Sequence, residues 1–207
     1  MAIKNIIFDL GGVIYDICYQ NIPEAFQRYG VKNFEILYSK AAQTDVFNLY
    51  EEGLVSTEQF REYLHSLSPI PLSDQQIDIA WNSIMIDIPE NRIKLLESIK
   101  NRYQLFLFSN TNQLNYEYYT QYVKEKFGYD IFNTLFVKAY FSHILQLRKP
   151  KPEAFQAIID EQRLNPSETL FLDDSLQHIE GAKKCGLQTY HVQDGEEIGD
   201  ILQSLNL

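Results

Sequence analysis

The sequence is poor in cysteine and in positive charge. Its two cysteines, Cys18 and Cys185, are too few for a disulfide framework. We expect two thiols in a reducing compartment, although their separation in the chain leaves a single bridge open. The 28 acidic residues outnumber the 18 basic ones, which gives a net charge of −10. Nucleic acids and anionic membrane surfaces would repel such a chain, so we expect neither as a partner.

Long apolar runs and flexible linkers are also missing. No apolar run approaches the roughly 18 residues that a membrane-spanning helix needs. The apolar stretch near the N-terminus is cut off at Asp9, too early for a signal peptide, and we expect a cytoplasmic protein. The 207 residues, 45% of them hydrophobic, contain no repeats and predict one globular domain, with room for a modest insertion.

The chain instead alternates between strand-like and helix-like segments. Strands are predicted at residues 3–8, 103–108, 135–141, 169–172 and 187–192, and helices at residues 89–99, 113–126, 152–162, 175–185 and 198–205. From about residue 21 to residue 82, aromatic and aliphatic side chains recur at helical spacing, which predicts three to five helices and no strand. This order is typical of an α/β fold, with a parallel sheet flanked by helices and a helical insertion after the first strand.

Polar residues stand where three of these strands end. Asp9 follows the first strand, Ser109 and Asn110 follow the second, and the pair Asp173-Asp174 follows the fourth. Ligands of such sheets bind at the carboxyl ends of the strands, so these side chains should converge. A lysine, Lys149, lies in the connection that precedes the helix at residues 152–162 and can reach the same point.

Each of these features alone also has a structural explanation. Asp9 can close an Asx turn, and one residue of 173–175 can cap the helix that follows. Two adjacent carboxylates repel each other, however, unless a positive group or a divalent metal lies beside them. Taken together, the residues supply a nucleophilic carboxylate, metal-binding carboxylates, a hydroxyl-amide anion site and a lysine. Phosphoryl transfer through an aspartyl phosphate requires this set.

Four segments carry a family resemblance. In order along the chain they are residues 6–13 (IIFDLGGV), 107–112 (LFSNTN), 148–155 (RKPKPEAF) and 171–175 (FLDDS). They resemble the four motifs of the haloacid dehalogenase superfamily, whose core is Rossmann-like. With its helical insertion the chain is similar to members with a small helical cap, and most similar to α-D-glucose-1-phosphate phosphatases and their sugar-phosphatase relatives. The resemblance implies a core of residues 1–15 and 88–207, and a cap of residues 16–87 that closes as a lid.

The resemblance also implies a cofactor, a substrate class and residue roles. The cofactor would be Mg²⁺ and the substrate a small phosphorylated metabolite, such as the sugar phosphate glucose 1-phosphate. The implied roles are nucleophile and metal ligand for Asp9, metal ligands for the Gly11 backbone carbonyl and for Asp174, metal support for Asp173, phosphate binding for Ser109 and Asn110, and a bridge between phosphate and nucleophile for Lys149.

One departure from the family pattern concerns acid–base catalysis. Most phosphatases of this superfamily have a second aspartate two residues after the nucleophile, where this chain has Gly11. Such a group typically contributes about 10²–10⁴-fold in rate. An anomeric oxygen leaves more easily than an ordinary alkoxide, so the absence of the acid would reduce the rate less for a sugar 1-phosphate. The second step would still need a base, which could be Asp16, a cap residue or solvent.

Two alternative functions stay open. A non-catalytic phosphate-binding or regulatory protein would explain Gly11. A 2-haloacid dehalogenase would use Asp9 without a metal, but the pair Asp173-Asp174 argues against it. His178 and the cluster of Asn115, Tyr116, Tyr118, Tyr119 and Tyr122 are interpreted as structural, the cluster as a packed helix face; a surface for sugar stacking or subunit contact is the less favoured interpretation of the cluster.

Overall fold

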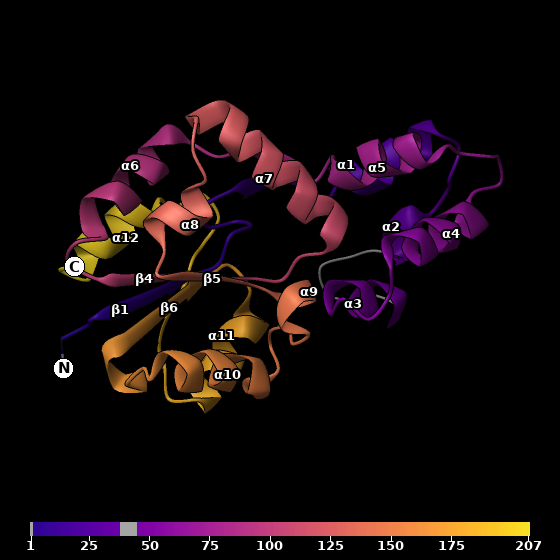
Figure 1. Ribbon diagram of the computed structural model, residues 1–207. Coiled ribbons are helices and arrows are strands. Elements are labelled where there is room, and N and C mark those ends of the chain that lie inside the picture. The colour runs from indigo at the N-terminus through magenta and orange to yellow at the C-terminus, as the bar shows by residue number, and fades with distance from the viewer. Residues whose placement is uncertain (1, 38–44) are drawn as a thin grey trace.

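The main sheet has five parallel strands in the order β5-β4-β1-β6-β7 (Figure 1). The computed structural model describes residues 2–37 and 45–207. The strands are β1 (Asn5–Phe8), β4 (Gln104–Ser109), β5 (Lys138–Phe141), β6 (Thr169–Asp173) and β7 (Gln188–His191). The sheet is flanked by helices, so the predicted α/β fold class is confirmed.

Strand β1 lies at the centre of the sheet, and the chain builds outward from it on both sides. Phe8 pairs with Leu107 of β4 on one side and with Leu172 of β6 on the other. The strand order therefore reverses at β1, which is where sheets of this kind bind ligands. As a result, the carboxyl ends of β1, β4 and β6 are neighbours.

The two faces of the sheet bury alternate side chains of the same strands. Ile6 and Phe8 pack into the layer that contains α6, α7, α8 and α12, whereas Ile7 packs against α10 and α11 (Figure 1). These helices are α6 (Glu90–Ile99), α7 (Gln113–Phe127), α8 (Ile131–Leu135), α10 (Pro152–Gln162), α11 (Leu176–Lys184) and α12 (Ile198–Ser204). Burial on both faces explains why β1 is almost continuously apolar.

The helical insertion, which begins after β1 and ends before α6, has its own aromatic core and lies to one side of the sheet (Figure 1). Its described helices are α1 (Asn21–Arg28), α2 (Phe34–Leu37), α3 (Asp45–Glu51), α4 (Thr57–Leu67) and α5 (Asp74–Asn82). The Phe47 ring stacks on Trp81 at a centroid distance of 5.6 Å. Ser56 and Ser73 begin α4 and α5 with capping boxes. Five described helices agree with the predicted three to five.

Some local elements differ from the expected ones. A short antiparallel sheet of β2 (Asp16–Ile17) and β3 (Met85–Asp87) flanks the insertion and was not predicted. Leu135 was expected in a strand but ends α8, because Asp130 accepts hydrogen bonds from the first turn of that helix and its apolar side chains pack into the core. The strand there begins only at Lys138, and a helical turn, α9 (Ser142–Leu145), follows it.

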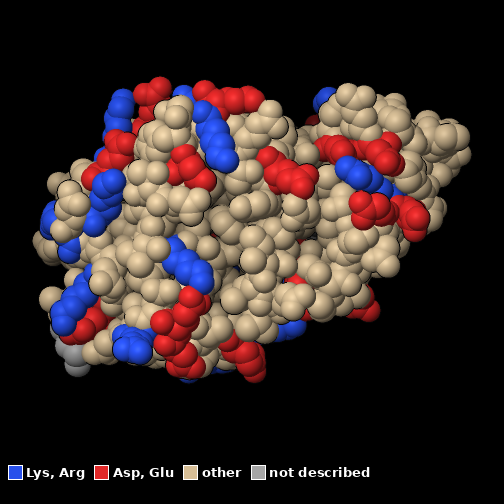
Figure 2. Space-filling model, viewed as in Figure 1, with Lys and Arg blue, Asp and Glu red and all other residues tan. Residues whose placement is uncertain are grey.

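The described helices are short or polar, and the visible surface carries charges of both signs. Among the described residues, none of the helices combines the length and apolarity that crossing a bilayer requires. Figure 2 shows acidic and basic side chains interspersed over one face, without a broad basic area there.

Helix α11 passes very close to the loop that carries Lys149. A Cβ at Gly181 would lie 2.3 Å from the carbonyl oxygen of Pro150. We therefore expect Gly181→Ala to lower the free energy of unfolding by about 1–3 kcal/mol, because helix or loop must shift. In the control Gly199→Ala, in α12, the new Cβ would meet Leu95 at 3.8 Å, an ordinary contact, and stability should be unchanged or slightly raised. Urea unfolding compares the two; equal stabilities would contradict the prediction.

Candidate active site

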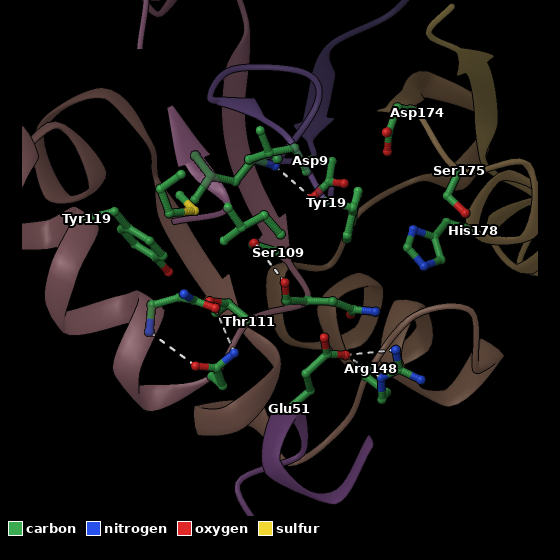
Figure 3. Close-up of a pocket in the computed structure, with 18 of the residues that line it drawn as sticks. Asp9, Tyr19, Glu51, Ser109, Thr111, Tyr119, Arg148, Asp174, Ser175 and His178 are labelled. Atoms are coloured by element: carbon green, nitrogen blue, oxygen red, sulfur yellow. Dashed lines mark hydrogen bonds and ion pairs between the residues drawn. The ribbon is translucent and has the colours of Figure 1, made fainter. Parts of the chain in front are cut away.

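A pocket opens at the carboxyl edge of the main sheet (Figure 3). Asp9 directly follows β1, Ser109 ends β4 and Asp173 ends β6. The pocket is lined from the core by residues that include Asp9, Gly11, Ser109, Asn110, Thr111, Tyr119, Asp174 and His178, and from the insertion by Tyr19, Glu51 and Ile84. The strand ends that were predicted to converge do so.

Lys149 lies beneath the pocket and is completely buried. Its Nζ is 2.9 Å from Asp9 Oδ1 and 2.7 Å from Asp173 Oδ2. It also donates a hydrogen bond to the Phe108 carbonyl oxygen at 2.8 Å. Burial lowers the pKa of this ammonium, but the charges of Asp173 and Asp9 outweigh it and the pKa is raised. Lys149 is therefore a fixed positive charge between two carboxylates.

Asp9 is held in a site that disfavours its charge. Its side chain is nearly buried, and its Oδ1 accepts a hydrogen bond from the Leu10 N–H at 2.7 Å. Burial raises the pKa of Asp9 well above its usual value, and the charges of Asp173 and Asp174 add to this effect. Lys149 lowers the pKa but does not cancel the increase. The pocket therefore has an excess of negative charge that a further cation would stabilise.

Both carboxylate oxygens of Asp173 are already held by neighbouring groups. Besides Lys149, it accepts a hydrogen bond from the Ser175 N–H at 2.8 Å, and His178 Nδ1 lies 2.9 and 3.0 Å from its two oxygens. Burial raises the pKa of Asp173, but Lys149 and His178 more than offset this and hold it well below its usual range. Asp173 thus stays ionised and fixes Lys149, and His178 fixes Asp173.

The Asn110 side chain pairs with the backbone of Lys149. Its amide donates to the Lys149 carbonyl oxygen at 2.9 Å and accepts from the Lys149 N–H at 2.9 Å. This reciprocal pair locks the lysine loop to the end of β4. The Ser109 hydroxyl is nearly buried, and its only hydrogen-bond contact with the described residues is a long one of 3.4 Å to the Asn110 carbonyl oxygen. Ser109 therefore has hydrogen-bonding capacity for an anion, while the Asn110 side chain positions Lys149.

The oxygen donors beside Asp9 fit a hard divalent cation. At Gly12, where φ is +77°, a Cβ would come within 2.6 Å of Asp174 Oδ2, so the Asp174 carboxylate packs against the turn that contains Gly11. Carboxylate and backbone oxygens are the ligands that Mg²⁺ prefers. Asp9, Asp173 and His178 also place ligand atoms within 4.8 Å of one another. In the group of Asp9, Asp173 and His178, however, Asp173 and His178 are already hydrogen-bonded to each other.

The insertion contacts this site through polar side chains that the sequence analysis did not identify. Arg148 Nε lies 3.0 Å from Glu51 Oε2 at the end of α3, and Lys151 pairs with Glu52. Trp81 of α5 donates from its indole N–H to Asn112 Oδ1 at 3.1 Å. These partners are about 30 to 100 residues apart in the chain. In the sequence, the only indication of these contacts was that two basic residues, Arg148 and Lys151, lie on either side of Lys149.

The space beside Gly11 is filled by an apolar side chain. A Cβ at Gly11 would meet Ile17 Cδ1 at 3.0 Å, so β2 occupies the place where a side chain would stand. Asp16, named above as a candidate base, does not line the pocket of Figure 3; Arg92 holds its carboxylate at 2.7 Å. Neither position 11 nor position 16 therefore provides an acid–base group inside this pocket.

Comparison with known proteins identifies the family. The family model of haloacid dehalogenase-like hydrolases matches residues 3–186, and the chain belongs to this family. It is 32% identical over 206 residues to a D-ribitol-5-phosphate phosphatase from Bacteroides thetaiotaomicron, covering 98% of this chain and 100% of the relative. The predicted superfamily is thus confirmed.

Solved structures agree with this assignment over nearly the whole chain. A haloacid dehalogenase family enzyme from Bacteroides thetaiotaomicron, solved as a variant with magnesium and inorganic phosphate, matches with a TM-score of 0.92 and 30% identity, covering 97% of this chain and 99% of that one. A hydrolase of the same family from Porphyromonas gingivalis matches with a TM-score of 0.86 and 29% identity over 100% of both chains.

Proposed function

We propose that this protein is a Mg²⁺-dependent phosphatase that hydrolyses small polyhydroxylated phosphate esters through an acyl phosphate (aspartyl phosphate) of Asp9. One observation carries the proposal: Asp9 lies at the switch point of the sheet, within 2.9 Å of a buried ammonium that Asp173 holds in place. This arrangement combines a fixed nucleophile with a fixed positive charge. The named phosphatase relative supports the same reaction class.

In the first step, the free Asp9 oxygen attacks phosphorus and the bond from phosphorus to the substrate oxygen breaks. The leaving oxygen takes a proton from a solvent water molecule, because neither position 11 nor position 16 supplies an acid in the pocket, and the phosphoryl group stays on Asp9. Lys149 attracts the phosphoryl oxygens and keeps the Asp9 side chain oriented, while the Ser109 hydroxyl donates to one of those oxygens. Water then attacks phosphorus, releases phosphate and restores the carboxylate.

We assign the cation to Asp9, the Gly11 backbone carbonyl and Asp174. These are the oxygen donors that lie around one turn, and the raised pKa of Asp9 reflects the negative charge that the cation would balance. When bound, Mg²⁺ would neutralise charge on the transferring phosphoryl group. Asp173 would support the site without binding the ion, because its oxygens are already held by Lys149 and His178.

The substrate proposed is a polyol or sugar monophosphate. Glucose 1-phosphate suits a site without an acid at Gly11, because an anomeric oxygen leaves readily. The relative, by contrast, is named for ribitol 5-phosphate, whose leaving oxygen is an ordinary alkoxide. The name favours the polyol ester, and we place ribitol 5-phosphate ahead of glucose 1-phosphate.

We further propose that residues 16–87 form a cap over a core of residues 1–15 and 88–207. The Arg148–Glu51 pair and the Trp81–Asn112 hydrogen bond join the insertion to the pocket from two sides. By holding the insertion over the pocket, these contacts would exclude water while Asp9 attacks.

A phosphate-release assay with Mg²⁺ or with EDTA tests the proposal. The panel comprises ribitol 5-phosphate, glucose 1-phosphate, other pentose and hexose monophosphates, and p-nitrophenyl phosphate. We expect turnover with Mg²⁺, a loss of at least about 10²-fold with EDTA, and recovery when Mg²⁺ is restored. Release that persists unchanged in EDTA would contradict the metal assignment. No release from any ester by the folded protein would instead favour the non-catalytic alternative.

A further inference from the structure

A tyrosine hydroxyl in the pocket lacks a well-formed hydrogen bond among the described residues. Tyr119 of α7 is 1% exposed and lines the pocket, and among the described residues its hydroxyl has no hydrogen bond of good geometry, the Thr111 side chain providing only a weak contact. Figure 3 shows its ring extending from α7 into the pocket, toward the side where Thr111 lies. Leaving a buried hydroxyl unpaired typically costs about 1–3 kcal/mol. An uncompensated group of this kind in a binding pocket indicates that a ligand atom completes it.

The ring that carries this hydroxyl is held rigidly. It packs against Phe132 and Tyr116 at centroid distances of 5.6 and 5.8 Å, and against Phe141 and Tyr15 at 6.2 and 6.5 Å. These contacts confirm that most of the aromatic cluster on α7 is a packed helix face. They also fix the direction of the phenol, so that a ligand would find the hydroxyl already in place.

The wall next to Tyr119 is polar and equally fixed. Asn112 donates through its amide to Asn115 Oδ1 at 2.8 Å, and Asn115 donates to Asn82 Oδ1 at 2.9 Å. Thr111, on the same wall, donates its backbone N–H to the Ser142 hydroxyl at 2.9 Å. This network anchors the start of α7 to α5 of the insertion. The Tyr119 hydroxyl therefore lies beside a preorganised polar surface, in the pocket that Asp9 also lines.

We propose that Tyr119 is a specificity-determining residue whose hydroxyl hydrogen-bonds a hydroxyl group of the substrate's carbon chain. The assignment rests on the proposed phosphatase activity and adds to it the group that selects polyhydroxylated esters over apolar ones. A pocket that offers a buried hydroxyl rejects a ligand lacking the matching group, because the protein hydroxyl is then left unpaired. An apolar pocket wall would have no such preference.

The test compares two esters that differ only in their hydroxyl groups, ribitol 5-phosphate and pentyl phosphate. Kinetics with Mg²⁺ are measured for the wild type and for Tyr119→Phe. We expect Tyr119→Phe to lower kcat/KM for ribitol 5-phosphate by about tenfold and to leave kcat/KM for pentyl phosphate within about twofold. The preference for the polyol ester should shrink by the same factor.

Tyr15→Phe is the matched control. Tyr15 is 0% exposed, and its hydroxyl is also buried without a partner among the described residues, but it does not line the pocket. Removing it should change neither kcat/KM. Neither variant should melt below the wild type, because each loses an unpaired polar group.

The outcomes separate the two proposals. If the wild type releases phosphate from none of the esters, the proposed function fails. If the wild type is active but Tyr119→Phe affects both esters equally or neither, Tyr119 is not the specificity residue, and its hydroxyl is satisfied by water instead. A selective loss for ribitol 5-phosphate in Tyr119→Phe, but not in Tyr15→Phe, supports the assignment.

Discussion

Replacing Asp9 with asparagine should abolish phosphate release without weakening the fold. The amide cannot attack phosphorus as a carboxylate does, so we expect kcat to fall by about 10⁴-fold or more. The pKa of Asp9 is raised by burial and by the nearby Asp173 and Asp174, so its ionised form costs stability in the folded state. Asparagine removes that cost, and the variant should unfold at the same or a higher urea concentration than the wild type.

The pH dependence of this stability effect has a definite sign. A carboxyl whose pKa is higher in the folded than in the unfolded chain destabilises the protein once the unfolded group ionises, above a pH of about 4. The advantage of Asp9→Asn should therefore vanish at lower pH and grow toward pH 7. Urea unfolding in EDTA measures it without interference from a bound cation. A variant that is clearly less stable than the wild type at pH 7 would contradict the charge environment described for Asp9.

Asp16→Asn is the control for the effect of Asp9→Asn on catalysis. Asp16 lies seven residues further along the chain, and its carboxylate is held by Arg92 outside the pocket. We expect this substitution to reduce kcat far less than Asp9→Asn does. Comparable losses in the two variants would instead indicate that Asp16 reaches the reaction and acts as the base.

The sheet and the convergence of the site were predictable because both depend on local signals. The apolar run before Asp9 and the similar runs before Ser109 and Asp173 each form a strand in the main sheet. In an α/β chain with helical connections, parallel pairing follows from the order of elements, so polar strand ends must meet at one edge. Asp9, Ser109 and Asp173 were placed correctly for this reason.

The contacts that complete the site depend on distant partners and could not be read from the sequence. Trp81 and Asn112 are 31 residues apart, and Glu51 and Arg148 are 97 apart, so no spacing pattern links them. The pairing of the Asn110 amide with the Lys149 backbone, 39 residues away, has the same cause. Leu135 was misplaced because an apolar residue suits either a strand or the end of a capped helix.

Among the substitutions considered, one that removes the charge of Lys149 should cause the largest loss in the free energy of unfolding. Lys149→Met leaves Asp9 and Asp173 buried side by side without their common counter-ion. Breaking a buried ion pair from one side typically costs about 3–5 kcal/mol. We expect a loss of that size in the free energy of unfolding at pH 7, together with loss of phosphate release. Lys151→Met is the control: Lys151 pairs with Glu52 while about half exposed, and such pairs contribute less than about 1 kcal/mol.

The loss in Lys149→Met should become smaller as the pH falls. Without the ammonium, the raised pKa of Asp9 rises further and the lowered pKa of Asp173 also rises, so protonation of these carboxyls at lower pH relieves their repulsion. The difference from the wild type should therefore be larger at pH 7 than at pH 5. If Lys149→Met does not fold at pH 7, Lys149→Met combined with Asp173→Asn removes one of the two charges and should restore part of the stability. A pH-independent loss, or no recovery in the double variant, would show that Lys149 stabilises the core by packing rather than by charge.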